Sequence, residues 1–409
     1  MNYTRSEVTQ FIRENDVKFI RLAFCDLFGI QKNISIMTDE LENTFRHGAM
    51  VNASLVRGFD DGENGELFLF PDPATMTTLP WRPSQGRVVR FFCDVKNRDG
   101  SAYYSDGRYL LKKAVKKLKD TGYSVRIGTK SEFYLFKLDE DGKPTATPND
   151  NAGFMDIAPA DKGENVRREI CLTLEEMGTQ PTRSHHEQGP GQNEIEFKDN
   201  FPLEAADELV TFRSVVKTIA QRSGLYATFL PRPLEDKNGS GLHITFTLCE
   251  KNGEIAGESG RAAGMCFMAG IMENIASITA FLNPLESSYD RLGKFTAPNS
   301  VSWSRRNGSH LFKTFDAPGK FELRSPDSAC NPYLAFALLI EAGADGVEKS
   351  LKAPGEGAAA SSLPAGLGEA IALAGNGFAV KVMEKTAEKF LSGQRKYLDG
   401  KEDGLSTYI

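Results

Sequence analysis

The chain has 409 residues, of which 40% are hydrophobic, 25% charged and 10% aromatic. This ordinary globular composition excludes collagen-like, disulfide-stapled and wholly disordered proteins. The formal net charge is −6, from 49 basic and 55 acidic residues, whereas proteins that bind nucleic acid or anionic lipid usually carry a basic surplus. Apolar runs such as residues 334–340 are too short to span a bilayer, and residues 1–11 lack the apolar segment of a secretory signal. We therefore expect a cytoplasmic enzyme with neither nucleic acid nor membrane among its partners.

The first hundred residues have the pattern of a small domain built from short strands. Residues 18–24 and 87–94 are predicted strands, and proline-rich turns lie between them. Beyond residue 101 the spacing of apolar residues predicts longer elements, with helices at 109–118, 162–177, 202–223 and 332–344 and strands at 123–127 and 132–137. Asn331 is the predicted cap of the last helix and Pro332 its first residue. We therefore predict an α+β protein with a β-rich domain over residues 1–100 and a larger α+β domain over residues 101–409.

Four strand-like segments carry carboxylates or histidine where apolar residues would be expected, while the GxxxxGK[ST], GxGxxG and HExxH motifs are absent. In the first segment, period-two alternation places Glu132 on one strand face with Tyr134 and Phe136. A buried carboxylate in that position needs a cation beside it. A strand-end glutamate that is paired with an arginine would have the same pattern.

The second segment, HHEQGPGQNEIEF at residues 185–197, contains a Gly-Pro-Gly reversal. The reversal would bring Glu187 and Glu194 together from opposite limbs. Two close carboxylates repel each other, so they need a shared proton or a divalent cation. Oxygen ligands favour Mg²⁺ or Mn²⁺ over Zn²⁺.

The third and fourth segments add a histidine, two threonines and a second acidic strand. After a glycine loop at residues 238–241, alternation places His243, Thr245 and Thr247 on one strand face. A lone histidine is more often structural, but the neighbouring segments favour a metal ligand. Glu322 and Arg324 share a face of the fourth segment, although a solvated outer strand would have the same pattern.

Together the four segments supply five candidate metal ligands and two candidate anion-binding arginines. The metal candidates are Glu132, Glu187, Glu194, His243 and Glu322, and the arginines are Arg291 and Arg324. Oxygen-rich divalent sites beside arginines suit phosphoryl transfer, because the cations screen phosphate charge and the guanidinium groups take up developing negative charge. The residues alone do not identify the acceptor of the phosphoryl group.

The chain resembles the glutamine synthetase family over nearly its whole length. The stretches that carry the resemblance are GELFLFPDPATMTTLPWR (65–82), KSEFYLF (130–136), NAGFMDIAPAD (151–161), HHEQGPGQNEIEF (185–197), NGSGLH (238–243) and FELRSPDSACNPYLAF (321–336). The resemblance implies an N-terminal β-grasp domain and a C-terminal catalytic domain whose antiparallel strands form a funnel surrounded by helices. It also implies hexameric rings stacked into a dodecamer, with each active site between neighbouring subunits. In that family ATP phosphorylates the side-chain carboxylate of glutamate, and an amine then attacks the acyl phosphate.

Matched residue by residue, the resemblance assigns roles to most of the candidates. It implies a first Mg²⁺ or Mn²⁺ on Glu132, Glu187 and Glu194, and two ligands of a second on His243 and Glu322. Glutamate binding is implied for Asn238, Gly239 and Arg291, and a catalytic role for Arg324 at the transferred phosphate or the substrate carboxylate.

Several positions depart from the family pattern, and they decide what we expect of the function. Lys130 replaces the third ligand of the second metal; since an ammonium group is a donor and not a ligand, we expect that metal to be weakened or replaced by the lysine charge. Asn52 replaces the aspartate that helps to deprotonate ammonium, and Thr296 the glutamate that closes over the ammonium site. Gly308 falls where the family has an arginine, unless a slip in the alignment lets Arg306 substitute for it. At nucleotide-binding positions the changes are Thr245, Lys313 and Lys320, with Thr247 on the same strand face as Thr245.

The loss of both acids removes the electrostatic trap for ammonium, and a single misplaced charge-stabilising group costs roughly 10²–10³ in rate. We therefore expect an ATP-dependent carboxylate–amine ligase that joins glutamate to an amine other than ammonia, with Thr296 and Gly308 leaving room for a bulkier amine. A different acid substrate would fit equally well. The alternatives are a catalytically silent homologue that binds nucleotide or amino acid or serves in assembly, glutamine synthetase itself, and a phosphagen-kinase-like phosphotransferase.

Overall fold

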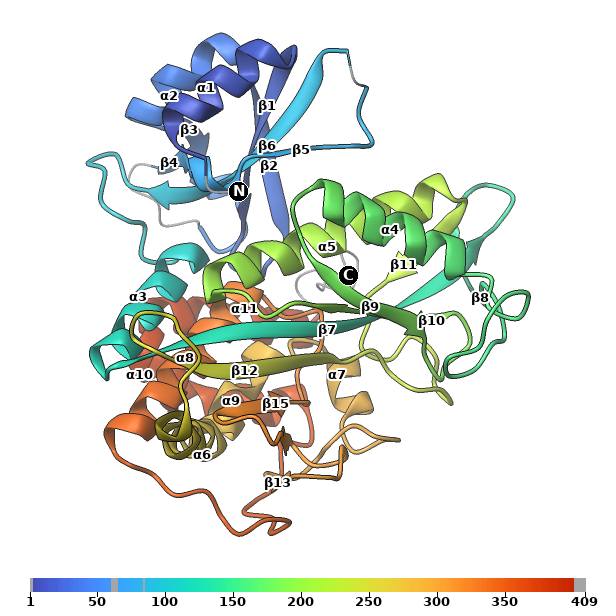
Figure 1. The fold of residues 1–409 in the computed structure, drawn as a ribbon, viewed down its shortest axis with the longest axis vertical. Helices are drawn as coiled ribbons and strands as arrows, with labels where there is room; N and C mark the ends of the chain where they lie inside the picture. Colours follow the sequence, from blue (N-terminus) through green and yellow to red (C-terminus); the bar gives the residue numbers. More distant parts are fainter. Residues whose placement is uncertain (1–2, 60–64, 84, 401–409) are drawn as a thin grey trace. The chain divides into compact units, whose positions relative to one another are not determined.

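The computed structural model describes residues 3–59, 65–83 and 85–400. The chain forms two compact units (Figure 1). The first unit comprises Met1–Leu110 and Leu172–Thr179, and the second comprises Leu111–Cys171 and Gln180–Ile409.

The first unit is built on a six-stranded sheet in the order β2-β1-β6-β4-β3, with β5 beside β6. Only one of its pairings, β1 with β6, is parallel among the described strands. The strands are β1 (Val17–Cys25), β2 (Gln31–Met37), β3 (Ala49–Asn52), β4 (Glu66–Pro71), β5 (Thr77–Thr78) and β6 (Arg87–Lys96). The two predicted strands of this region lie within β1 and β6 and are confirmed.

Two helices of the first unit escaped the sequence analysis. They are α1 (Arg5–Glu14) and α2 (Leu41–His47). The start of α1 carries a capping box, in which Thr4 Oγ1 accepts from the backbone N–H of Glu7 and the Glu7 carboxylate accepts from the backbone N–H of Thr4. This Thr-x-x-Glu pattern is the signal that could have located the helix.

The second unit is built on a nine-stranded sheet in the order β13-β14-β15-β12-β7-β10-β9, with β8 and β11 also paired to β7. The strands are β7 (Tyr123–Leu138), β8 (Pro144–Pro148), β9 (Pro181–His186), β10 (Gln192–Phe197), β11 (Leu225–Thr228), β12 (Leu242–Glu250), β13 (Trp303–Ser304), β14 (Phe312–Thr314) and β15 (Lys320–Leu323). The prediction of two strands at 123–127 and 132–137 was wrong, because β7 runs unbroken between them. Its middle residues stay in register with β12, and Gly128 leaves room for the Asp199 carboxylate that a Cβ would displace.

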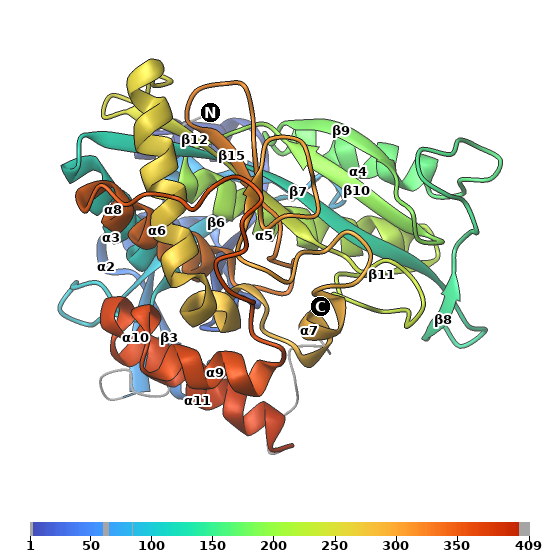
Figure 2. The ribbon, with the colours of Figure 1, turned by 90° about the horizontal axis from the view of Figure 1, so that it is seen from below.

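Helices pack against the second sheet and against one another (Figures 1 and 2). They are α3 (Gly107–Asp120), α4 (Glu164–Glu176), α5 (Pro202–Arg222), α6 (Glu258–Leu282), α7 (Glu286–Arg291), α8 (Pro332–Glu348), α9 (Leu367–Gly375), α10 (Phe378–Met383) and α11 (Lys385–Leu398). The four helices predicted beyond residue 101 correspond to α3, α4, α5 and α8. The predicted cap of α8 is confirmed, since Asn331 Oδ1 accepts from the backbone N–H of Tyr333 and of Leu334.

Helix α6 is the longest helix among the described residues, and it lies beside α8 in both views (Figures 1 and 2). By length and composition it could cross a membrane, a property that the sequence analysis passed over, but 67% of its most apolar window is buried within the fold. The two helices approach closely at Gly270 and Gly346. A Cβ built on Gly270 would lie 2.1 Å from the carbonyl oxygen of Ala342 and 2.7 Å from Cα of Gly346.

This close approach predicts that Gly270→Ala destabilises the fold by about 1–3 kcal/mol, because the added methyl group forces the two backbones apart. Helix propensity alone predicts the opposite sign, a gain of about 1 kcal/mol. The matched control is Gly368→Ala in α9, where a Cβ meets nothing within 4 Å. Denaturant unfolding of the three proteins measures the difference, and a Gly270→Ala protein as stable as the control would contradict the packing argument.

Candidate active site

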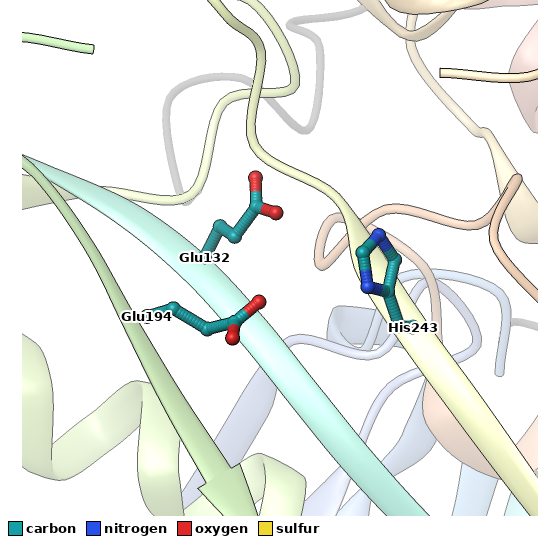
Figure 3. A group of neighbouring side chains, drawn as sticks. All are labelled: Glu132, Glu194 and His243. Atoms are coloured by element: carbon teal, nitrogen blue, oxygen red, sulfur yellow. The ribbon is translucent and has the colours of Figure 1, made fainter. Parts of the chain in front are cut away.

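Carboxylates from neighbouring strands of the second sheet meet the imidazole of His243 at one place (Figure 3). Glu132 on β7 lies directly opposite Glu194 on β10 in the antiparallel register, and His243 stands near the start of β12 on the other side of β7. One ligand atom from each of the three residues lies within 4.8 Å of the others. Strand pairing, and not loop folding, therefore brings residues of three predicted segments together.

The hairpin between β9 and β10 supplies a further carboxylate. Its antiparallel register and turn confirm the predicted reversal, and one atom each of His185, Glu187 and Glu194 lies within 4.8 Å of the others. His185 Nε2 is 3.0 Å from Glu187 Oε1 and 3.8 Å from Glu194 Oε1. Only glycine fits at position 189 in the turn, because a Cβ on Gly189 would lie 2.0 Å from the Tyr134 hydroxyl oxygen. The predicted trio Glu132, Glu187 and Glu194 thus forms one cluster.

Buried partners orient Glu132 and the Glu187 limb. Glu132 Oε2 accepts from the backbone N–H of Gly241 at 2.9 Å and from Gln192 Nε2 at 3.1 Å. Beneath Glu187, His186 Nδ1 lies 2.6 Å from the Glu187 carbonyl oxygen, and His186 Nε2 lies 2.9 Å from Asp150 Oδ1. The carbonyl oxygen and the carboxylate are both acceptors, so both ring nitrogens must donate and His186 is held as an imidazolium.

The pKa shifts of this pair agree with that assignment. Burial alone would lower the pKa of His186, but the hydrogen bonds to Asp150 and to the Glu187 carbonyl outweigh burial and raise it. Burial opposes ionisation of Asp150 too, yet His186 and the backbone N–H of Gly191 bring its pKa down to about 2. Asp161, the third acidic group nearby, is paired by Arg167 at 2.6 Å. We therefore interpret this buried cluster as an ion-pair network that supports the hairpin, not as a metal site.

The carboxylate cluster itself is strongly destabilised in its ionised form. Burial, followed by the charges of Glu194 and Glu187, raises the pKa of Glu132 well above its usual range. Burial and the charge of Glu187 raise the pKa of Glu194 to about 7. Glu132 and Glu194 resist ionisation, and with the adjacent carboxylate of Glu187 they form a site that a divalent cation would neutralise. The oxygen atoms of the three carboxylates fit Mg²⁺ or Mn²⁺. The residues present therefore fit the first metal that the resemblance implies.

Glu322 and His243, the predicted ligands of a second metal, differ from the carboxylate cluster because Glu322 is readily ionised. Glu322 on β15 is 1% exposed at its side chain, and its Oε1 lies 2.7 Å from Arg324 Nη1. Burial alone would raise the pKa of Glu322, but His243, Lys130 and Arg324 bring it down to about 2. Burial, and next the charge of Arg324, lowers the pKa of His243 to about 3. Glu322 is thus already neutralised by cationic side chains of the chain.

A pocket of about 310 Å³ opens over the carboxylates and gathers most of the predicted substrate residues. Asn238, Gly239, Arg291 and Arg324 line it together with Lys130. The Arg291 side chain is buried, and its Nη2 donates to the backbone carbonyl oxygens of Ser325 and Pro326. A Cβ on Gly239 would overlap the Arg291 side chain and the carbonyl oxygen of Pro231.

The mouth of this pocket is apolar, a feature that the sequence analysis missed. Phe154, Met155 and Phe295 line the pocket although their side chains are 52%, 60% and 58% exposed. Met155 and Phe295 adopt φ values of 59° and 52°, which non-glycine residues rarely adopt. Thr296 lines the same rim. Large exposed hydrophobic residues held in a left-handed backbone beside a charged pocket are a signal of binding that only the structure provides.

The other predicted pocket positions lie apart from this lining. A Cβ on Gly308 would stand 3.6 Å from Cζ of Arg324, so the missing side chain leaves space over that guanidinium group. Arg306 is exposed, and its backbone N–H donates to Ser304 Oγ. Asn52 belongs to the first unit, where it ends β3 and its Oδ1 accepts from the backbone N–H of Ser54 at 3.1 Å.

The four predicted nucleotide-binding residues lie on adjacent strands. Thr247 Oγ1 donates to Asp199 Oδ2 at 2.7 Å, and Lys320 Nζ lies 3.1 Å from the same oxygen. Thr245 and Lys313 both pair with Glu322 across the sheet. Within the described part of the chain, none of the four lines the carboxylate pocket. Their role in binding nucleotide stays a prediction.

Comparison with known proteins matches both parts of the chain to one family. The family models that match are "Glutamine synthetase, beta-Grasp domain" over residues 16–98 and "Glutamine synthetase, catalytic domain" over residues 104–371. The glutamine synthetase of Clostridium saccharobutylicum is 41% identical over 363 residues, which are 87% of this chain and 82% of that protein. The glutamine synthetase of Methanosarcina mazei is 41% identical over 362 residues, 86% of this chain and 81% of that protein.

Solved structures with the same fold include an ADP complex of GmaS and a glutamine synthetase of Plasmodium falciparum. The GmaS complex is 26% identical to this chain, with a TM-score of 0.87 over 97% of this chain and 96% of that one. The Plasmodium structure is 21% identical, with a TM-score of 0.86 over 100% of this chain and 99% of that one. At that identity the Plasmodium structure supports the fold alone.

The raised pKa values predict that the affinity of the carboxylate cluster for Mn²⁺ rises with pH. Below about pH 7 a proton holds Glu194 and competes with the cation, and this competition is lost as the pH rises through about 7. The raised pKa of Glu132 adds to the competition from protons. Titration calorimetry from pH 6 to pH 8, in buffers of different ionisation enthalpy, measures both the affinity and the protons released. An affinity independent of pH, with no proton release, would contradict the account.

The buried support of the hairpin predicts that Asp150→Asn weakens Mn²⁺ binding about 10–100-fold, because His186 and the Glu187 limb lose their anchor. The control is Asp141→Asn, which removes an exposed carboxylate in a turn and should leave the affinity unchanged. Circular dichroism establishes that both variants fold. A folded Asp150→Asn protein with the wild-type Mn²⁺ affinity would show that the network does not position Glu187.

Proposed function

The chain belongs to the glutamine synthetase family, and from that premise we propose that it is an ATP-dependent ligase that joins the side-chain carboxylate of glutamate to an amine other than ammonia. The family models cover more than half of the chain, and its β-grasp and catalytic domains are those expected from the sequence. ATP use accords with the family and with the ADP complex of the GmaS structure. What this chain adds to the family pattern is a changed amine pocket.

The proposed phosphoryl transfer draws on the two oppositely charged halves of the pocket. Glu132, Glu187 and Glu194 would hold Mg²⁺ or Mn²⁺, which when bound screens the negative charge of phosphate oxygens. Arg291 is fixed by two backbone carbonyl oxygens and presents its remaining donors to an anionic substrate. Arg324, held by Glu322, stabilises the negative charge that develops on the transferred group.

The observation that carries the choice of amine is the apolar surface at the mouth of the pocket, where Thr296 stands in place of an acid. Thr296 stands where the resemblance places an acid, and Phe154, Met155 and Phe295 surround it with apolar surface. Ammonium is small and fully hydrated, so an apolar rim without an acid offers it no compensation for lost water. An organic amine can bury its carbon atoms against this rim while its nitrogen approaches the activated carboxyl group of the substrate.

Assembly into hexameric rings or a dodecamer is part of the same proposal. Met50 and Leu55, which flank Asn52 in the first unit, are 56% and 83% exposed. Apolar side chains exposed to this degree are typical of surfaces that another subunit covers. We infer that Asn52 completes the amine pocket of a neighbouring subunit in the assembly.

The proposal predicts ADP release when Mg²⁺, ATP and L-glutamate are supplied with methylamine, ethanolamine or putrescine, and little release with ammonium. The double variant Asn52→Asp with Thr296→Glu returns both acids to the pocket, so its ammonium-dependent rate should rise about 10²-fold or more relative to wild type. Organic-amine rates should fall in the same variant. Release with ammonium alone would identify glutamine synthesis as the activity, and silence with every pair would favour a different acid substrate or a silent homologue.

A further inference from the structure

Lys130 lines the pocket and contacts the carboxylate of Glu322, which lies outside the cluster of Glu132, Glu187 and Glu194. On β7 it pairs in register with Glu196 of β10 on one side and with His243 of β12 on the other. Its Nζ lies 3.2 Å from Glu322 Oε2 and 3.7 Å from Glu196 Oε1. The ammonium group therefore bridges two carboxylates from strands on either side of β7, as a bound cation would.

The two carboxylates of Glu322 and Glu196 are balanced by the two cations Lys130 and Arg324, so no net negative charge remains for a further cation. Glu322 is almost completely buried and faces two permanent cations, Lys130 at 3.2 Å and Arg324 at 2.7 Å. A divalent ion placed among His243, Glu322 and Lys130 would meet a fixed ammonium charge at close range, and the ammonium group has no lone pair to offer it. The donor set thus does not fit a second metal, in contrast to the three carboxylates of the first.

We propose that the Lys130 ammonium group takes the place of a second divalent cation, so that each subunit binds one divalent ion, at Glu132, Glu187 and Glu194. The proposal rests on the first metal site of the proposed function but not on the identity of the amine. Lys130 lines the pocket beside Arg324 and His243 and presents its donors to it. A tethered single charge of this kind holds anionic substrate oxygens without depending on metal concentration.

The experiment counts Mn²⁺ ions per subunit by equilibrium dialysis of the assembled protein with the metal alone. Wild type should bind one ion. Lys130→Glu should bind two, because a third ligand joins His243 and Glu322 once the ammonium charge is gone. The matched control is Lys137→Glu, which makes the same charge change at an exposed position on the same strand and should bind one.

Two outcomes overturn the proposal: two ions of similar affinity on wild type, or a folded Lys130→Glu protein that still binds one. A third variant, Lys130→Met, removes the charge without adding a ligand, and it keeps the test valid if Lys130→Glu does not fold. This variant should bind one tight ion. A second tight ion would show that Glu322 and His243 are sufficient ligands for a second metal. The count is independent of turnover. Ammonium-only activity with one bound ion would contradict the proposed amine and leave this inference standing, and organic-amine activity with two ions would do the reverse.

Discussion

The repulsion among three clustered carboxylates, of which Glu194 is buried and Glu132 and Glu187 are half-buried, is the constraint on which the rest of the second unit depends. Two unit charges 4 Å apart repel by about 4 kcal/mol at an effective dielectric constant of 20, so Glu132, Glu187 and Glu194 cannot all be ionised without compensation. Strand register and a glycine turn nevertheless force them together, and the His186–Asp150 pair and Gln192 hold that arrangement. Such a cluster is stable only with protons or a divalent cation, and its function follows from that requirement.

On the same sheet, the buried carboxylate of Glu322 has its pKa shifted in the opposite direction to that of Glu194. The pKa of Glu194 is raised to about 7 by burial and a like charge, whereas cationic neighbours bring that of Glu322 down to about 2 despite its burial. One half of the pocket thus requires a cation from solution, and the other half carries its own in Lys130 and Arg324. The pocket presents three carboxylates, the fixed positive charges of Lys130 and Arg324 and an apolar mouth, an arrangement that accords with the proposed joining of a carboxylate to an organic amine.

The sequence was sufficient to predict what local chemistry and strand alternation determine. It located the hairpin of Glu187 and Glu194, the cap of α8 and the shared face of Glu322 and Arg324, because each follows from spacing and turn residues. It could not predict that β7 is continuous, since Gly128 and Lys130 interrupt the apolar pattern and are tolerated only through partners far away in sequence, Asp199 and Glu322. The apolar rim could not be predicted for the same reason, because the exposure of its side chains and the backbone conformation of Phe295 are properties of the folded chain.

If this pocket activates a carboxylate by phosphoryl transfer, an oxygen atom of that carboxylate must appear in the released phosphate, and isotope labelling measures this. The side-chain carboxylate of glutamate is labelled with ¹⁸O and supplied with ATP, Mg²⁺ and the panel of amines, and the released phosphate is analysed by mass spectrometry. Attack of the carboxylate on ATP carries one labelled oxygen into each phosphate when the amine displaces it. Phosphate that carries one ¹⁸O is the predicted result; unlabelled phosphate released in step with an amide product would contradict the account.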